Sequence, residues 1–171
     1  IRKTQQKGKH MNQYIETQTQ LLIEDVNKAI ETFFSRDPLT EKLIPIFKEN
    51  FQMAMDDHVP YTLEQLEGKG LTDEQKWQHI EAETPIWGID SQDAFDSGII
   101  NDADVDSFIQ RYGIPESFLK EHGDFYAIDH VTITYYDTLI RDLLDARQAG
   151  ITNTGLKELV STVENNTEMQ W

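Results

Sequence analysis

The sequence predicts an all-α fold: a compact single domain of about seven or eight mostly short helices, with a division into two sub-lobes left open. Three observations lead to this prediction. Apolar residues recur at spacings of three and four along most of the chain, which is the period of a helix with one buried face. Helix start and stop signals separate these periodic stretches. Residues 131–135 alternate with a period of two, but they run without interruption into a helical pattern, so no strand is expected.

The first half of the chain contains two long helical patterns. Residues 14–34 form one apolar stripe, with Ile15, Leu22 and Val26 on it. Asp37 followed by Pro38 is an N-cap and first-turn signal for the next helix. Residues 57–60 are expected to end that helix.

The segments around this second helix leave two questions open. Pro45 lies inside the pattern, so either the helix kinks there or residues 40–44 form a separate turn. Residues 61–70 are ambiguous between a short helix and a glycine-containing loop. Residues 72–75 then form a capping box that opens a helix through about Glu83.

Short elements dominate the middle of the chain. Residues 86–89, Ile-Trp-Gly-Ile, form a short apolar segment after Pro85, which is expected to end the preceding helix. Residues 91–97 predict one or two helical turns. A helix capped by Asn101 or Asp102 is expected to reach Tyr112, and another runs from Pro115 to His122. Glycines follow both as C-terminal signals.

The last part of the chain predicts two more helices. Asp129 is expected to cap a long helix that ends near Ala149, with Val131, Leu139 and Leu143 on its apolar stripe. Thr154 is expected to open a final helix that ends near residue 165.

The ends of the chain differ from the rest. Residues 1–10 contain four Lys or Arg and no acid, and a His-Met junction follows them, so they are predicted to be a cloning-derived segment; the alternative is a native basic arm. Residues 11–165 are expected to form a single acidic helical domain, with a soft boundary near 85–88. Residues 166–171 are expected to be a loose tail.

Composition excludes several classes of protein. The 171 residues contain no Cys, which excludes a disulfide scaffold, a thiolate metal site and a Cys nucleophile. No apolar stretch approaches the roughly 18 residues of a membrane helix, and no signal peptide is visible. The chain has 31 Asp and Glu against 15 Lys and Arg, a net charge of −16. Such a charge disfavours contact with nucleic acids or anionic membranes.

The acids concentrate in the second half of the chain. Between Asp90 and Ala146 there are 13 acids, of which 11 are Asp, opposed by only three basic residues. Asp has a shorter side chain than Glu and prefers caps and turns to helix interiors. Asp137, Arg141 and Asp145 follow a spacing of four and are expected to pair with one another on one helix face. We expect a partner to contact nine of the other acids of this region, namely Asp90, Asp93, Asp96, Asp102, Asp104, Asp106, Glu116, Glu121 and Asp124.

The known catalytic and metal-binding motifs are absent. Alternating acids from Asp102 suggest a calcium loop, but an EF-hand requires Gly at loop position 6 and Glu at position 12, where Ser107 and Gly113 stand. His and carboxylate residues that could form a metal site match no strong spacing; these are Asp56, Asp57, His58, His79, Glu83, His122, Asp124, Asp129 and His130. Neither a metal nor another cofactor is therefore expected.

The leading hypothesis is a non-enzymatic interaction protein that uses its acidic surface as a DNA mimic. The expected partner is a basic protein, such as a nuclease or another nucleic-acid-binding protein, in the cytoplasm. In general character, though in no motif, the composition resembles inhibitors of restriction enzymes and CRISPR nucleases that mobile elements carry. No direct contact with nucleic acid or membrane is expected, and a homodimer is left open.

Two alternatives belong to other classes. One is a phage or plasmid structural, assembly or immunity protein, in which the acids provide solubility and residues 86–89 form the interface. The other is a metal-dependent enzyme with a His/carboxylate site. A mimic should gather its second-half acids on one face, whereas a solubility surface scatters them.

Overall fold

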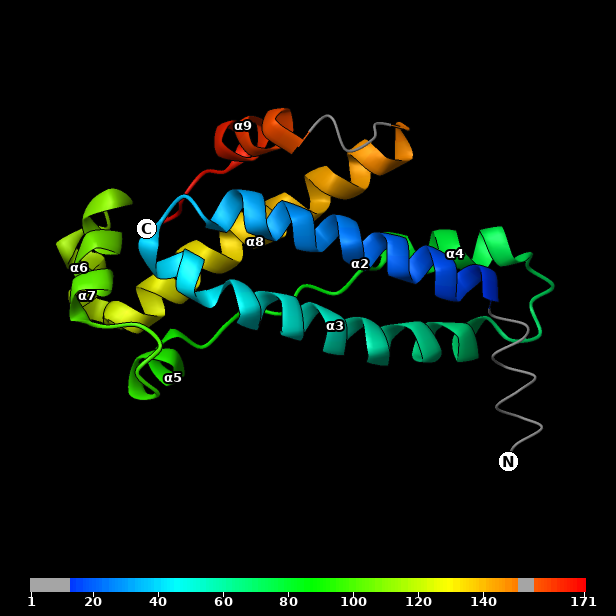
Figure 1. The fold of residues 1–171 in the computed structure, drawn as a ribbon, viewed down its shortest axis with the longest axis horizontal. Coiled ribbons are helices and arrows are strands. Elements are labelled where there is room, and N and C mark those ends of the chain that lie inside the picture. Colours follow the sequence, from blue (N-terminus) through cyan, green and yellow to red (C-terminus); the bar gives the residue numbers. More distant parts are fainter. Residues whose placement is uncertain (1–12, 151–155) are drawn as a thin grey trace.

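The structure is a computed structural model that describes residues 13–150 and 156–171. Within these ranges it contains helices and no strand, which confirms the predicted all-α fold. The expected cloning-derived segment and Thr154 lie outside the described residues. The described helices, labelled as in Figure 1, are α2 (Gln13–Phe34), α3 (Pro38–Leu66), α4 (Asp73–Ala82), α5 (Ser91–Asp96), α6 (Asp102–Arg111), α7 (Glu116–His122), α8 (Asp124–Gln148) and α9 (Leu156–Asn166).

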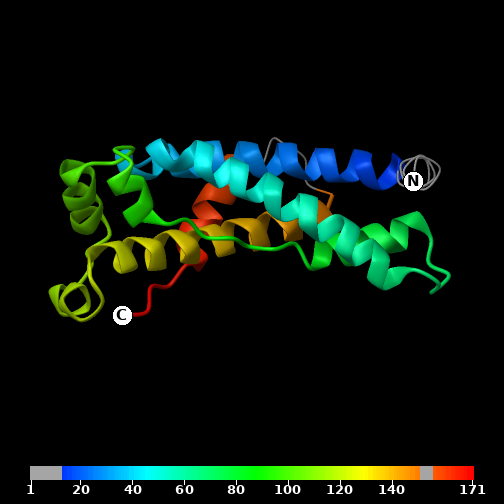
Figure 2. The ribbon, with the colours of Figure 1, turned by 90° about the horizontal axis from the view of Figure 1, so that it is seen from below.

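Three long helices form the body of the protein. Helices α2 and α3 run antiparallel as a hairpin, and α8 crosses beside them (Figures 1 and 2). Helix α9 packs on α8 and α2, and α4 packs on α3 and α2. The short helices α5, α6 and α7 gather at one end of the body, around the first turns of α8 (Figures 1 and 2).

The core lies between the apolar stripes of the long helices. On α2 the stripe is the predicted one, and Leu22, Val26 and Ile30 are fully buried. Phe34 stacks on Phe47 with ring centroids 4.4 Å apart, and the ring of Tyr136 lies 5.3 Å from that of Phe47. Burial of such large aromatic side chains stabilises the junction of α2, α3 and α8.

Helix α3 is longer than the sequence indicated. It runs without a break through Pro45 and Pro60 to Leu66, so the separate turn at 40–44 and the predicted end at 57–60 are both wrong. Each proline lacks an N–H and leaves a carbonyl four residues earlier without its helical partner. Those carbonyls belong to Glu41 and Asp56. Both of these residues and both prolines are exposed, so water can donate hydrogen bonds to the two carbonyls. Burial of Thr62 and Leu66 favours continuation of the helix.

Side-chain caps start three helices where the sequence placed them. The Asp37 carboxylate accepts the N–H groups of Leu39 and Thr40, at 2.9 and 3.2 Å. Thr72 and Asn101 each take part in a capping box at the start of α4 and α6. These bonds satisfy N–H groups that the helix itself leaves free.

The start of α8 differs from the prediction. The helix begins at Asp124, after Gly123, whose φ of 89° reverses the chain at no steric cost. Asp129, the predicted N-cap, lies inside the helix. Its carboxylate accepts the backbone N–H of Ser91 at 3.0 Å, and the Ser91 hydroxyl donates to the carbonyl of Phe125 at 3.1 Å. Asp129 therefore anchors α5 to α8 instead of capping α8.

Residues 86–89 pack against the protein's own core. Ile89 is buried and Ile86 is partly buried against the core, whereas Trp87 is 40% exposed. A Cβ on Gly88 would lie 3.2 Å from Cδ1 of Ile133, so the chain passes close to α8 at this point. The Gly88 carbonyl also accepts the side-chain amide of Asn50 at 3.2 Å. The apolar segment 86–89 thus contacts both α3 and α8.

The last residues of the chain contact α7 and α8, although the sequence suggested a loose tail. His130 donates its Nε2 hydrogen to the carbonyl of Gln170 at 2.8 Å. The Trp171 ring packs edge-on against Phe118, with centroids 5.0 Å apart. Across the ranges that the structure describes, no helix combines the length and apolar character needed to cross a membrane.

Candidate functional site

Helices α5, α6 and α7 and the start of α8 form one end of the protein (Figures 1 and 2). These segments and the residue before α5 contain many acidic residues. Eight of the nine residues expected to contact a partner lie on these elements or, for Asp90, cap α5, and all eight are exposed. We call these eight the acidic end; they are Asp90, Asp93, Asp96, Asp102, Asp106, Glu116, Glu121 and Asp124. Because α5, α6 and α7 each pack on α8, the acidic end is carried by helices attached to one support.

Few cations oppose the acidic end. Among the described residues, Glu116 is the one member that forms an ion pair with a lysine or arginine, at 3.3 Å from Lys120. Both side chains of that pair are more than three quarters exposed, so the pair contributes little. Glu121 lies 3.8 Å from the ring of His122. The local field at this end is therefore negative.

Asp104 does not belong to this surface, and the structure corrects the expectation that it contacts a partner. It is only 8% exposed. One carboxylate oxygen accepts the backbone N–H of Asn101 at 3.0 Å and the Nζ of Lys42 at 2.7 Å. Lys42 lies on α3, so this carboxylate caps α6 and also ties it to the body of the protein.

Asp90 and Asp129 hold α5 in place. Asp90 caps α5 by accepting the N–H of Asp93 at 3.0 Å, and it remains exposed. Burial raises the pKa of Asp129, while the bonds from Ser91 lower it. These contacts make α5 a fixed support for its acids.

A cluster of aromatic and histidine rings lies beside the acids of α7 and α8. His122 stacks on Tyr126 with centroids 4.7 Å apart, and Phe118 contacts both rings as well as Trp171. Tyr126 is 55% exposed and Trp171 is 44% exposed. Exposed aromatic faces next to carboxylates can bind Lys or Arg side chains by cation–π contact. Trp171 joins the cluster only through tertiary packing, since it lies far along the chain from Phe118 and His130.

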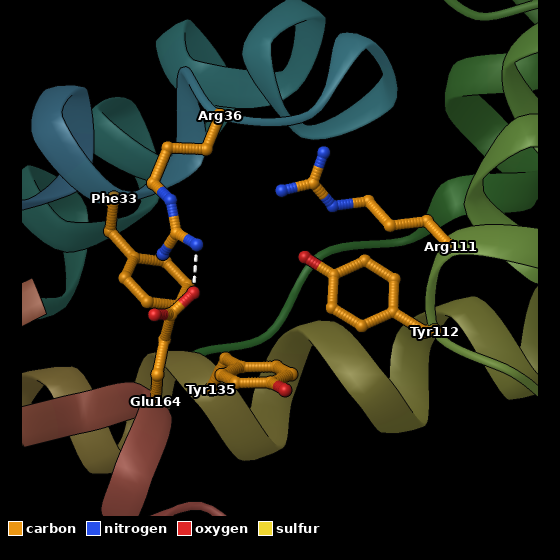
Figure 3. A pocket seen from close by; sticks show the side chains of 6 residues that line it. All are labelled: Phe33, Arg36, Arg111, Tyr112, Tyr135 and Glu164. Atoms are coloured by element: carbon orange, nitrogen blue, oxygen red, sulfur yellow. Dashed lines mark hydrogen bonds and ion pairs between the residues drawn. The ribbon is translucent and has the colours of Figure 1, made fainter. Parts of the chain in front are cut away.

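A pocket of about 220 Å³ opens where α2, α6, α8 and α9 meet (Figure 3). Its lining residues are Phe33, Arg36, Arg111, Tyr112, Tyr135 and Glu164. Arg36 lies over the Phe33 ring, 5.1 Å from its centroid, and forms an ion pair with Glu164. The Arg111 guanidinium and the Tyr112 hydroxyl point toward the same space (Figure 3). No local sequence pattern indicates this pocket, because its residues come from four separate segments.

The candidate metal ligands do not come together. Within residues 13–150 and 156–171, no three His or carboxylate side chains form a group that could hold a metal ion. Several have other local roles instead. His58 donates to the carbonyl of Ile80 at 2.8 Å, and His130 bonds to the C-terminal segment. His79 and Glu83 are exposed on and after α4.

Comparison with protein-family models, with curated proteins and with solved structures gave no match to this chain.

Proposed function

We propose that this chain is a non-enzymatic acidic interaction protein that binds a basic nucleic-acid-binding protein in place of DNA. The observation that carries the proposal is the acidic end: eight exposed carboxylates on α5 and its cap, on α6, on α7 and at the first residue of α8. Among the described residues, one of the eight pairs with a lysine or arginine, so most of this charge is free to meet a basic partner.

The chemistry of the acidic end suits a partner that binds DNA. Duplex DNA carries about one negative charge per 1.7 Å of its axis, and proteins that bind it present rows of Lys and Arg. Six of the eight carboxylates are Asp. The Asp side chain is short, so its charge stays close to the protein backbone, just as the phosphate charges of DNA lie on the DNA backbone. The net charge of −16 would also accelerate encounter with a basic partner.

The aromatic cluster supports the same surface. Long-range charge attraction speeds association but gives limited affinity, because exposed ion pairs are weak. Large aromatic side chains often supply most of the binding energy at protein interfaces. Tyr126 and Trp171 lie beside Phe118 of α7. Helix α7 carries two of the acids of the acidic end. They would give a basic partner an apolar contact within the acidic surface.

In its finer form, the proposal is an inhibitor of a restriction or CRISPR nuclease carried by a mobile element. Such a protein would act in the cytoplasm, where its target meets DNA. The alternative of a phage or plasmid assembly protein relied on residues 86–89 as the interface. That segment now offers mainly Trp87, since Ile89 is buried and Ile86 is partly buried. No observation specifically favours the assembly protein or the metal-dependent enzyme.

The test compares two charge-reversal variants of equal net charge. The first converts three exposed residues of the acidic end to Lys: Asp96, Asp102 and Asp106. The matched control converts three exposed glutamates near the opposite end of α3 and on α4: Glu64, Glu67 and Glu74. Each reversal adds two charges, so both variants change from −16 to −10. Asp104 is left intact because its loss would disturb α6.

Affinity capture from the source cells should use the wild type and both variants, at low and at physiological salt. The expected partner is basic and binds nucleic acid, and DNA should compete with this protein for it. It should be retained by the wild type and by the control, and lost by the acidic-end variant. Added salt should weaken its capture. An acidic partner, or equal capture by both variants, would contradict the proposal.

A further inference from the structure

The pocket in Figure 3 is lined by none of the eight residues of the acidic end, and two of its side chains are cationic. Two guanidinium groups, those of Arg36 and Arg111, approach it from different elements, and the Tyr112 hydroxyl points between them (Figure 3). The rings of Phe33 and Tyr135 form apolar walls. We propose that this pocket binds a small phosphate-type oxyanion, either free phosphate or the terminal group of a phosphomonoester.

The donors in the pocket suit an oxyanion. A guanidinium presents several N–H groups in one plane and can bind two oxygens of a phosphate or carboxylate at once. Across the described part of the chain, Arg111 forms no ion pair within 4.0 Å, and its guanidinium carbon lies 5.9 Å from the Tyr112 ring centroid. Burial raises the pKa of Tyr112, so its hydroxyl keeps its proton at neutral pH and can donate it.

One carboxylate already occupies part of this position. Glu164 reaches in from α9 and pairs with Arg36, and its side chain is 44% exposed. A carboxylate that pairs with a guanidinium resembles a bound oxyanion, and this one can move toward solvent. Asp37 is a second carboxyl group nearby; burial raises its pKa, and the N–H groups of Thr40 and Leu39 and then the charge of Arg111 partly oppose this shift. An incoming phosphate would therefore compete with Glu164 for Arg36 and use Arg111 as its second contact.

The size of the pocket limits the ligand. Pockets that enclose drug-sized molecules or cofactors have volumes of about 300–1,000 Å³. At about 220 Å³ this pocket is smaller, and guanidinium and hydroxyl groups supply its polar contacts. It suits a single phosphate group, which the aromatic walls would contact at its edge. A phosphomonoester would have to leave the rest of its structure outside.

Isothermal titration calorimetry with inorganic phosphate, against chloride of equal ionic strength, tests the proposal. The wild type should bind phosphate saturably. Arg111→Gln should weaken binding by about tenfold or more, since hydrogen bonds between two charged groups are stronger than those between neutral groups. Its matched control is Arg141→Gln, which removes the same charge from an exposed arginine of α8 and should leave binding unchanged. Tyr112→Phe keeps the ring and should weaken binding severalfold.

Removal of the competing carboxylate gives the opposite result. Glu164→Gln should tighten phosphate binding severalfold, whereas Glu158→Gln, an exposed change on the same helix, should not. Parallel titrations with phenyl phosphate and acetate identify the source: tighter binding of phenyl phosphate indicates a monoester, equal or weaker binding indicates the free ion, and preference for acetate contradicts a phosphate site.

Three results would overturn the proposal. The first is phosphate binding no stronger than chloride. The second is an equal loss of affinity in the Arg111 and Arg141 variants, because a general charge effect would explain it. The third is a Glu164 variant that binds no tighter than the Glu158 variant. Melting curves in chloride alone establish that each variant is folded. If Arg111→Gln does not fold, Tyr112→Phe provides the test instead.

Discussion

Replacement of Asp104 by Ala should destabilise the protein, whereas the same change at Asp106, two residues away, should not. Asp104 is 8% exposed and accepts two hydrogen bonds, one from the Asn101 backbone and one from Lys42. Asp106 is exposed on the opposite side of the same turn of α6. From the sequence alone, both were expected to contact a partner.

The magnitude follows from the two bonds that are lost. Loss of a side-chain cap costs about 1 kcal/mol, and a backbone N–H left without a partner away from water costs about 1–3 kcal/mol. The ion pair adds little to this, because the Lys42 side chain is 43% exposed and can return to water. We expect Asp104→Ala to lower the free energy of unfolding by about 2 kcal/mol. Asp104→Asn, which keeps an acceptor for Asn101, should cost about 1 kcal/mol.

Thermal and urea unfolding followed by circular dichroism provide the measurement. For a domain of this size, 1 kcal/mol corresponds to about 2–4 °C in Tm, so Asp104→Ala should lower Tm by about 4–8 °C. Asp106→Ala should remain within about 0.5 kcal/mol of the wild type. If the two alanine variants melted together, Asp104 would not be the buried cap that the structure shows, and its contact with α3 would be wrong.

Three further predictions concern other charged groups. Burial raises the pKa of Asp37 from its ordinary value of 3.8, so the folded protein binds this proton more tightly than the unfolded chain, and stability should fall as pH rises from about 3.8 to the raised pKa. Asp37→Asn keeps the cap and should make the free energy of unfolding, measured by urea unfolding at several pH values, fall less steeply with pH. An unchanged pH dependence would exclude the effect. Arg147→Ala should cost about 2–4 kcal/mol in the same assay, because it leaves Asp25 and the 8% exposed Glu81 without their cation; a loss below about 0.5 kcal/mol would show that these pairs are weak. In a gel-shift assay at physiological salt, the wild type should not bind duplex DNA, and submicromolar binding would contradict the electrostatic argument for a protein partner.

Local signals in the sequence determined most helices and their starts. The caps at Asp37, Thr72 and Asn101 lie where the sequence placed them, because a cap bonds only to residues two or three positions away. Gly113, with a φ of 59°, follows α6 as predicted for the same reason. The apolar stripes of α2 and α8 were also visible, since one buried helix face leaves a period that the sequence alone displays.

Predictions made from local signals were wrong where contacts or burial involving distant parts of the chain outweighed those signals. Asp129 resembled a cap but lies inside α8, because its carboxylate bonds to Ser91, which is distant in the sequence. Pro60 resembled a helix end, yet α3 continues to bury Leu66. A proline costs one hydrogen bond, and burial of an apolar side chain can offset that cost.

The sequence by itself determined the helical class, the negative charge and the region in which the acids concentrate. Only the tertiary structure decided which acids are free. Asp104 looked like its neighbours until the packing of α6 on α3 brought Lys42 to it, across 62 positions of the chain. The pocket formed by Arg36 and Arg111 arises in the same way, from segments that no local pattern connects. Periodicity and capping act within a few residues, whereas ion pairs and pockets depend on how whole helices pack, and that is set by the summed burial of their apolar faces.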